Sequence, residues 1–449
     1  MMETIELKGF WWIPGNEEET MVGTLKFTSN EGSNLELIVE FFDEEKFNVD
    51  IILGRTSNGA DITLYKCFMI NYSYNSKGFS TVKIYSNIIF EGMHFNKIED
   101  IKFKEISCHY SNLDEWAWMN GFDVNQNTYN QIEVKYQFPI KEVVEVNNDY
   151  TVEIYPDIQM SSRNLVQKEM TISQKIYTKV INKTSKSFEE HMNELRHVQN
   201  FISLGVSKPV VIMELVGKTE ANQEVFGKYI HYPKVNIYFE VQNLEQSQKS
   251  IIPLKMLFNL REIKGEFSNI LKTWFERKEL LEPIINLYFG TQYNSQIYLE
   301  QKFLNLVQAV ESYHRRTRKN IEIEESEHQK RIATILNSVA DEHKDWLEGR
   351  LSYSNEPILR KRLKELVNDC AEILRLNSNQ RDSFIYKVCT TRNYFTHYDK
   401  SLEGKAAKAI ELIDICNKLE KIIQFNLLIE IGFTKESAKG LMDKLYNYR

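Results

Sequence analysis

Cysteine, proline and glycine are all scarce in this chain of 449 residues. The 5 cysteines are an odd number without a C-x-x-C pair, which argues against a disulfide framework and against a cysteine-rich zinc site. With 18 Gly and 8 Pro the chain is neither collagen-like nor of low complexity, and its 42% hydrophobic residues are enough for sizeable cores. The length suggests two or three domains. We therefore expect an ordinary folded protein of a reducing compartment.

Long hydrophobic runs are also missing. The most apolar late stretch, residues 422–433, is interrupted by Gln424, Asn426 and Glu430, so no membrane span is expected. Residues 1–15 carry acids and a Pro-Gly pair where a signal peptide needs a basic start and an apolar core. These features predict a cytoplasmic protein without a membrane partner.

The chain has no excess of positive charge, and its net charge is −7. This balance excludes a polycation that coats nucleic acid through charge alone. The charges are uneven, however, because 26 basic and 23 acidic residues lie from Thr291 onward, against 30 basic and 40 acidic residues before it. A site for a polyanion is therefore expected in the last third.

Common cofactor and metal motifs are absent. The sequence contains neither a G-x-S-x-G elbow nor a G-x-G-x-x-G loop, and Gly217-Lys218-Thr219 lacks the glycine that a phosphate loop requires five positions earlier. His191 and His197 are six positions apart, which misses the i, i+4 spacing of two metal ligands on a helix. We interpret them as residues of a solvated helix face, and we predict no metal site and no cofactor.

Two hydrophobic periods divide the sequence. Up to about residue 240, short runs rich in Val, Ile, Thr, Phe and Tyr, such as 23–28, 60–70, 81–90 and 234–241, alternate with turn residues and predict antiparallel strands. Residues 188–201 instead have helical spacing, which predicts a helix beside the sheets.

After about residue 253 the pattern becomes helical almost throughout. The predicted helices are 295–319, 326–346, 357–376, 379–397, 402–431 and a short last one ending near residue 446. The predicted fold class is thus α+β in two parts. A β-rich domain resembling a sandwich or barrel occupies residues 1–250, and an all-α helical bundle occupies residues 251–449.

The most informative segment lies near the C-terminal end of the 379–397 helix. Asn393 and His397 share a face at i, i+4, and Arg392 can reach toward them with its long side chain. An imidazole can take the proton of a ribose 2′-OH or return one to the leaving 5′-oxygen. A guanidinium can hold the phosphate oxygens as negative charge builds on them. The trio suits RNA cleavage without a metal ion, with Asn393 orienting the phosphate or the imidazole.

These residues resemble the signature of the HEPN superfamily, R-x4-6-H, often with a polar residue after the arginine. Arg392, Asn393 and His397 match R-N-x-x-x-H. The helix at 303–315 is similar to the first long helix of the ApeA-like variety. Residues 9–25, with the segments GFWWIPG and GTL, resemble the β-rich N-terminal domain of ApeA antiphage proteins.

The resemblance implies a metal-independent endoribonuclease of bacterial antiviral defence by abortive infection. It implies a HEPN bundle that dimerises so that two motifs face one cleft, RNA as substrate with tRNA a favoured class, and a β-rich sensor that responds to a phage-derived trigger. In such proteins the first helix often carries an acid, which here is Glu311, a candidate partner for Arg392 or His397.

Several alternatives stay open. The candidates for holding RNA are four cations at the end of the first long helix, Arg315, Arg316, Arg318 and Lys319. Glu322, Glu324, Glu325 and Glu327 predict a solvated helix start, with a metal-dependent nuclease as a remote alternative. Tyr394 and Phe395 are expected to pack the bundle rather than stack on a base. The main alternative function is a non-catalytic scaffold or sensor that binds a phage protein or nucleic acid. In this alternative a recognition surface is lined by Trp11, Trp12, Trp116 and Trp118, although core packing is the simpler expectation for most of them.

Overall fold

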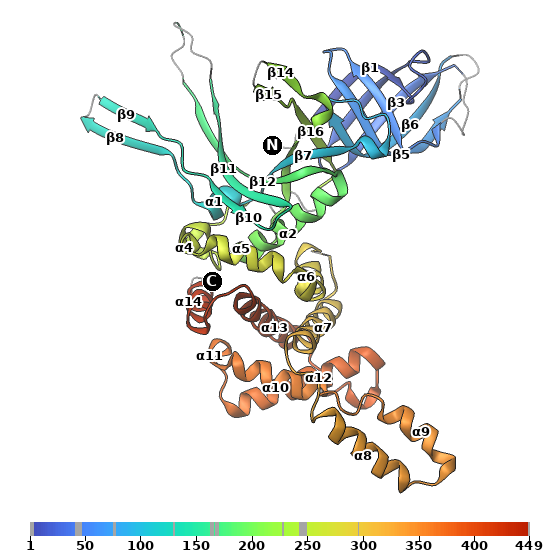
Figure 1. Ribbon diagram of the computed structural model, residues 1–449, viewed down its shortest axis with the longest axis vertical. Coiled ribbons are helices and arrows are strands. Elements are labelled where there is room, and N and C mark those ends of the chain that lie inside the picture. The colour runs from blue at the N-terminus through green and yellow to red at the C-terminus, as the bar shows by residue number, and fades with distance from the viewer. Residues whose placement is uncertain are drawn as a thin grey trace. The chain divides into compact units, whose positions relative to one another are not determined.

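The computed structural model describes residues 4–40, 47–74, 78–128, 131–161, 166, 170–226, 229–241, 249–294 and 296–447. The chain forms two compact units, Met1–Lys272 and Thr273–Arg449 (Figure 1). All described strands belong to the first unit, and the second is helical. The predicted two-part α+β fold class is confirmed. The two compact units divide after Lys272, whereas the sequence pattern changes near residues 250–251.

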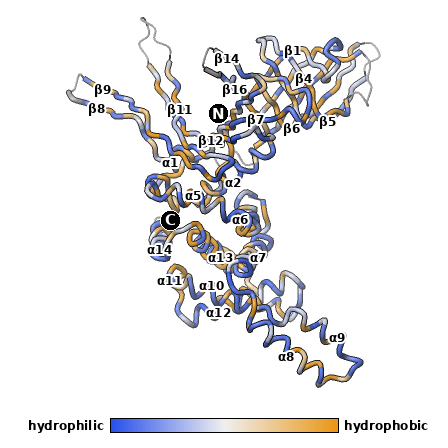
Figure 2. The backbone as a smooth tube through the Cα atoms, in the orientation of Figure 1, coloured by the Kyte–Doolittle hydropathy of each residue, from blue (hydrophilic) through white to orange (hydrophobic). Residues whose placement is uncertain are grey.

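A closed antiparallel barrel opens the first unit. Its strands follow the hydrogen-bonded order β6-β3-β2-β1-β4-β5, and β5 pairs again with β6, which closes the ring. Alternate residues of these strands point inward, so hydrophobic and hydrophilic positions alternate along the strands in Figure 2. The barrel strands are β1 (Thr4–Trp12), β2 (Met21–Thr28), β3 (Gly32–Val39), β4 (Ile51–Thr56), β5 (Asp61–Ser73) and β6 (Ser80–Glu91).

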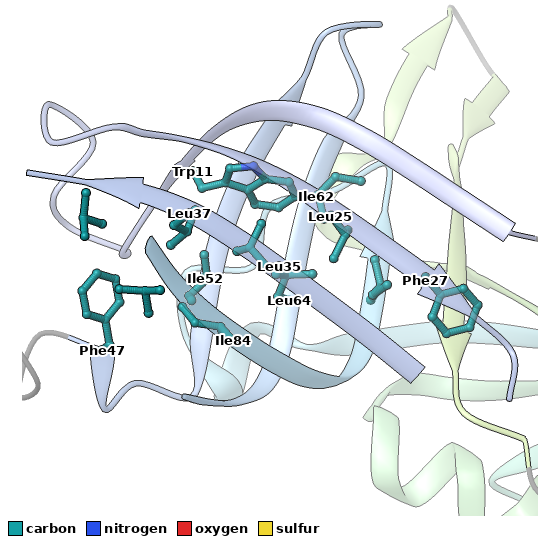
Figure 3. Close-up of a cluster of buried hydrophobic side chains, with 13 residues drawn as sticks. Trp11, Leu25, Phe27, Leu35, Leu37, Phe47, Ile52, Ile62, Leu64 and Ile84 are labelled. Atoms are coloured by element: carbon teal, nitrogen blue, oxygen red, sulfur yellow. The ribbon is translucent and has the colours of Figure 1, made fainter. Parts of the chain in front are cut away.

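The barrel core is filled by aromatic and aliphatic side chains (Figure 3). Trp11 is completely buried among residues such as Leu25 and Leu37. Its ring lies against Gly54, where an added Cβ would come within 2.3 Å of the Trp11 ring, so the glycine makes room for the indole. Trp116, elsewhere in the same unit, is also fully buried, so the expectation of core packing is confirmed for Trp11 and Trp116. Trp12 is only partly buried, and Trp118 is 39% exposed.

The sheet continues beyond the barrel. From β6 the hydrogen-bonded order runs β16-β13-β7-β12-β11-β10, and two further hairpins, β8–β9 and β14–β15, stand apart. The remaining elements of this unit are β7 (Lys102–Tyr110), α1 (Leu113–Ala117), β8 (Phe122–Thr128), β9 (Gln131–Tyr136), β10 (Glu142–Glu145), β11 (Tyr150–Met160), β12 (Ile172–Ser187), α2 (Phe188–Val206), β13 (Ile212–Lys218), β14 (Glu224–Phe226), β15 (Tyr229–His231), β16 (Lys234–Phe239), α4 (Leu260–Ile263) and α5 (Phe267–Glu276), the last of which crosses the division of the units.

Helix α2 is the predicted helix among the strands, and it packs against β7 and β12. Ser187 and Glu190 form a capping box at its N-terminus. The expectation of a solvated face for His191 and His197 is wrong, because both are buried. His191 Nε2 lies 2.9 Å from the carbonyl oxygen of Phe103, and burial lowers the pKa of His191.

The second unit is a bundle in which α7 contacts α6, α10, α12 and α13. Two predicted helices are each divided into two in the structure. The predicted helix 326–346 is interrupted at residues 338–340, and the predicted helix 357–376 is interrupted at Cys370. At the first interruption, Ser338 follows the last residue of α8 and its Oγ donates a local hydrogen bond to the Ile335 carbonyl oxygen. Position 295, the predicted start of one helix, lies outside the described residues. The helices are α6 (Lys278–Tyr293), α7 (Leu299–Thr317), α8 (Glu325–Asn337), α9 (Asp341–Leu351), α10 (Leu359–Asp369), α11 (Ala371–Leu374), α12 (Ser378–His397), α13 (Ala409–Glu430) and α14 (Lys435–Asn447).

No helix in the described part of the chain combines the length and the apolar character that crossing a bilayer requires.

Candidate active site

Helix α12 presents the R-N-x-x-x-H segment at its C-terminal end. A capping box starts the helix, in which Asn377 Oδ1 accepts from the Gln380 N–H at 3.0 Å and the Gln380 side chain returns a bond to the Asn377 N–H. The helix ends where Tyr398 adopts a left-handed conformation with φ 51°. His397 is therefore the last helical residue, and it is exposed.

Arg392 is held loosely on this helix. Its Nη1 donates to Asn393 Oδ1 at 3.2 Å, so the guanidinium does reach round toward the face that Asn393 shares with His397. Its Nη2 lies 3.9 Å from Glu311 Oε2 on α7, the outer limit of an ion pair. The Arg392 side chain is 35% exposed and that of Glu311 is 27% exposed. A guanidinium with one neutral acceptor and one distant carboxylate keeps most of its donors for a ligand.

His397 has no hydrogen bond within the described residues, and Asp399 lies close to it. Hydrogen bonds from Ser401 hold the pKa of Asp399 below its ordinary value, and the nearby His397 acts in the same direction. Since Asp399 Oδ1 already accepts from the Ser401 N–H at 2.9 Å, it caps the following turn. The imidazole is left facing solvent, where it can exchange a proton with a bound molecule.

The hydrophobic side of the same segment anchors it to the bundle. The Phe395 ring meets Phe303 of α7 edge-on, with 6.0 Å between the centroids, so the expected packing role of Phe395 is confirmed. Thr391 is fully buried, and its Oγ1 accepts from the Ala407 N–H at 2.9 Å. Arg392 and His397 are thus carried by a helix whose inner face is fixed.

The four cations proposed to hold RNA are already engaged. Arg316 donates from Nε and Nη2 to the carbonyl oxygens of Leu280 and Glu279, each at 2.7 Å. The other three form ion pairs, Arg315 with Glu356 at 2.8 Å, Arg318 with Asp369 at 2.9 Å and Lys319 with Glu324 at 2.5 Å.

These cations also lie toward the other end of α7. Phe303 meets Phe395, and Glu311 lies beside Arg392, so α7 and α12 run in opposite directions. The basic run follows Glu311 on α7 and extends away from the end where His397 lies. The structure brings Glu311 to the motif, and it does not bring the basic run to it.

The acidic residues after the basic run form a helix start, as expected. Glu325 begins α8 and accepts a hydrogen bond from Asn355, and Glu322 pairs with Lys361 at 3.2 Å. Within the described ranges no three His, Cys, Asp or Glu side chains are grouped as metal ligands.

Behind the motif lies a buried polar cluster that the sequence analysis did not identify. Arg362 of α10 is 1% exposed, and its Nη1 lies 3.2 Å from His314 Nδ1. His314 is fully buried, and its Nε2 lies 2.8 Å from Glu365 Oε2, which assigns the Nε2–H tautomer, with Nδ1 as the acceptor. Burial lowers the pKa of His314, and the bond to Glu365 opposes that effect. We name Arg362, His314 and Glu365 the polar triad; Arg362 and His314 are buried, whereas the Glu365 side chain is 49% exposed.

The sequence did carry a signal for this cluster. Leu359, Leu363, Leu366 and Val367 form the apolar stripe of α10, and Arg362 occupies the remaining position of that stripe. A cation at such a position is either paired or functional.

Arg360 and Cys389 complete the surroundings of Arg392. Burial raises the pKa of the Cys389 thiol, and the charges of Arg360 and Arg392 oppose that rise. Arg360 is exposed and has no hydrogen bond or ion pair within the part of the chain that the structure describes. Arg360 and Arg392 thus both lie close enough to Cys389 for their charges to act on its thiol.

Comparison with known families agrees with both units. Residues 6–274 match the ApeA N-terminal domain 1, and residues 304–437 match the Apea-like HEPN domain. No curated protein and no solved structure matches the chain. The second match contains the whole of the α12 segment, and HEPN domains form a ribonuclease superfamily of defence systems. The chain belongs to the ApeA family, with an ApeA N-terminal domain 1 followed by an Apea-like HEPN domain.

Proposed function

We propose that this protein is a metal-independent endoribonuclease of bacterial abortive-infection defence, with tRNA as the favoured substrate. The observation that carries the proposal is the exposed end of α12, where the imidazole of His397 has no hydrogen bond within the described residues and the Arg392 side chain, 35% exposed, lies five residues before it in a HEPN domain. The expected compartment is the cytoplasm, where such RNA is found.

The proposed reaction is an internal transesterification. The imidazole of His397 takes the proton of the ribose 2′-OH, and the 2′-oxygen attacks the adjacent phosphorus. The bond from phosphorus to the 5′-oxygen breaks, and the 5′-oxygen takes up a proton. The products are a 2′,3′-cyclic phosphate and a 5′-hydroxyl. Arg392 stabilises the charge on the non-bridging oxygens, Asn393 positions the phosphate, and Glu311 orients Arg392 before RNA binds.

We propose a dimer because the reaction needs two proton transfers. The reaction needs one group that accepts a proton and one that donates a proton, whereas one protomer supplies a single exposed imidazole at the motif. Two facing copies of α12 supply both. Light scattering is expected to show a dimer, and the specific cleavage rate is expected to fall on dilution below the dimer dissociation constant. A monomer that cleaves at full rate contradicts this arrangement.

The β-rich unit is proposed to be the sensor that raises the activity of the nuclease above its basal level when a phage-derived trigger arrives. The test is phage infection of cells that carry either the full chain or a chain with charge-reversing substitutions on the exposed hairpin β8–β9. Loss of protection, with RNA cleavage by the purified variant unchanged, supports a sensor role. Protection that is unchanged argues against a role of this hairpin in sensing.

The central experiment uses purified protein, total tRNA and an excess of EDTA. The proposed nuclease cleaves under these conditions and leaves a 2′,3′-cyclic phosphate, and a single 2′-deoxy nucleotide at the cleaved position blocks the cut. A metal-dependent nuclease stops in EDTA. A protein that binds RNA and never cuts it is the scaffold, and this result rejects the proposed activity.

A further inference from the structure

Two guanidinium groups of different character act on Glu311. One is Arg392, exposed at 35%, whose Nη2 is 3.9 Å from Glu311 Oε2. The other is Arg362, only 1% exposed. Glu311 and His314 occupy the same face of α7 at i, i+3, and His314 is the residue that Arg362 Nη1 contacts at 3.2 Å. The Glu311 carboxylate therefore has a second cation within one helical turn.

Arg362 has donors to spare. Its Nε and Nη2 are buried and make no hydrogen bond within the described residues. The nearest carboxylate to Nη2 is that of Glu356, 3.5 Å away, and Glu356 already pairs with Arg315 at 2.8 Å. Buried N–H groups without an acceptor are costly, and a buried guanidinium is normally paired with a carboxylate.

Electrostatics supports the closeness of Glu311 to this group. Burial lowers the pKa of Arg362, and Glu311 is the first among the carboxylates that oppose this effect, ahead of Glu356 and Glu365. The Glu311 carboxylate is therefore among the charges that act on Arg362, as its position one helical turn from His314 requires.

Binding of RNA creates a conflict at Glu311. A phosphate can accept two parallel hydrogen bonds from the Arg392 guanidinium. This interaction is stronger than the one with a carboxylate 3.9 Å away. If the Glu311 carboxylate stayed beside Arg392, it would repel the incoming phosphate and lose its own cation. A second position for the carboxylate removes both costs.

We propose that Glu311 is a two-position carboxylate, paired with Arg392 in the free protein and with the unused donors of buried Arg362 when an RNA phosphate occupies Arg392. Arg362 is then a positioning residue, which never touches RNA and acts by receiving Glu311. The inference deepens the proposed function, because it rests on Arg392 being the phosphate-binding residue.

The test is a double-mutant cycle on RNA binding. The probe is a fluorescent 2′-O-methyl RNA oligonucleotide, which cannot be cleaved, and its dissociation constant is measured by anisotropy. Arg362→Met is expected to weaken binding about tenfold, because Glu311 then stays at Arg392. Glu311→Gln is expected to bind at least as tightly as the wild type, because the competing charge is gone.

The double variant decides the matter. In the Glu311→Gln background, Arg362→Met is expected to change binding less than twofold, because no carboxylate remains to be received. Equal weakening in both backgrounds means that Arg362 only supports the fold, and this result overturns the proposal. No weakening by Arg362→Met in the wild-type background overturns it too.

Controls separate folding and catalysis from this exchange. Arg375→Met, which alters an exposed arginine of the same bundle, is the matched variant and is expected to leave binding unchanged. If Arg362→Met does not fold, Arg362→Lys is used in the same two backgrounds, with a smaller effect of the same sign. Cleavage of unmodified RNA is measured in parallel. Binding without cleavage rejects the nuclease and leaves the cycle valid, whereas a wild type that does not bind the analogue overturns the two-position carboxylate.

Discussion

Two histidines of the helical unit have opposite surroundings. His314 on α7 is fully buried, and both of its ring nitrogens have partners, Arg362 and Glu365. His397 on α12 is exposed and has no hydrogen bond within the described residues. A ring that has used both nitrogens holds the bundle together, whereas a ring with both nitrogens open can exchange protons with a ligand.

The cations show the same contrast. The run from Arg315 to Lys319 is engaged with carboxylates and carbonyl oxygens, whereas Arg392 has only Asn393 and a distant Glu311, and Arg360 has neither hydrogen bond nor ion pair in the described part of the chain. Charge density along the sequence therefore predicts that the basic run binds RNA. The availability of hydrogen-bond donors in the structure instead favours Arg392 and Arg360.

Removal of the open imidazole is expected to have the largest effect. His397→Ala should lower the RNA cleavage rate by about 10²- to 10⁴-fold, the usual contribution of a general acid or base, and should leave the unfolding temperature within 1 to 2 °C or so of the wild type. The assay is gel-resolved cleavage of tRNA in EDTA. His343→Ala, which removes an exposed histidine of α9, is the matched control and should cleave normally. Cleavage at the normal rate by His397→Ala rejects the assigned role.

Arg392 comes next in expected effect. Arg392→Ala should lower cleavage by about 10²-fold or more, because the transition-state charge loses its main donor. Arg392→Lys keeps the charge but not the two-pronged geometry, so it should restore only part of the loss. Single-turnover rates separate this effect from binding. A cleavage rate fully restored by Arg392→Lys would mean that the site needs only a positive charge and does not need the two-pronged hydrogen bonding of the guanidinium.

The two groups of cations can be compared directly through the salt dependence of binding. Arg360→Ala should weaken binding of the 2′-O-methyl RNA and lower the slope of log K against log salt by about one, as expected when one phosphate contact is lost. Arg318→Ala breaks the pair with Asp369 and should lower the unfolding temperature with little change in that slope. If the slope falls for Arg318→Ala and stays for Arg360→Ala, RNA follows the basic run and the present assignment is reversed.

Local patterns in the sequence were sufficient for the fold class and for the position of the candidate motif. Alternating apolar residues placed the strands, and helical spacing placed α7, α12 and α13. The motif was identified by its resemblance to the R-N-x-x-x-H signature, and because its three residues lie within a single helix, their spacing fixes which side chains share a face.

Contacts between distant segments could not be read in the same way. The burial of His191 and His197 depends on how α2 packs against β7 and β12, which no local period reveals. Arg315 pairs with Glu356 and Arg318 with Asp369, which lie 41 and 51 positions later in the chain. The polar triad likewise joins His314 to Arg362, 48 positions later. Only the cation in the apolar stripe of α10 gave a local hint of it.

The smallest expected effect concerns the paired histidine. The pKa of His314 is lowered by burial, so below about pH 6.5 the unfolded chain takes up a proton that the folded chain refuses. Its contribution to stability is therefore complete above that pH and is lost as the pH falls. His314→Gln should lower the stability at pH 7.5 but flatten the decline between pH 7.5 and pH 5.5, as measured by urea unfolding at the two values. His343→Gln should leave the decline as steep as in the wild type, because its ring is exposed. Parallel pH profiles for wild type and His314→Gln would mean that the buried ring already accepts a proton in the folded state, and the contrast between the two histidines would then be one of access to solvent and no longer one of protonation.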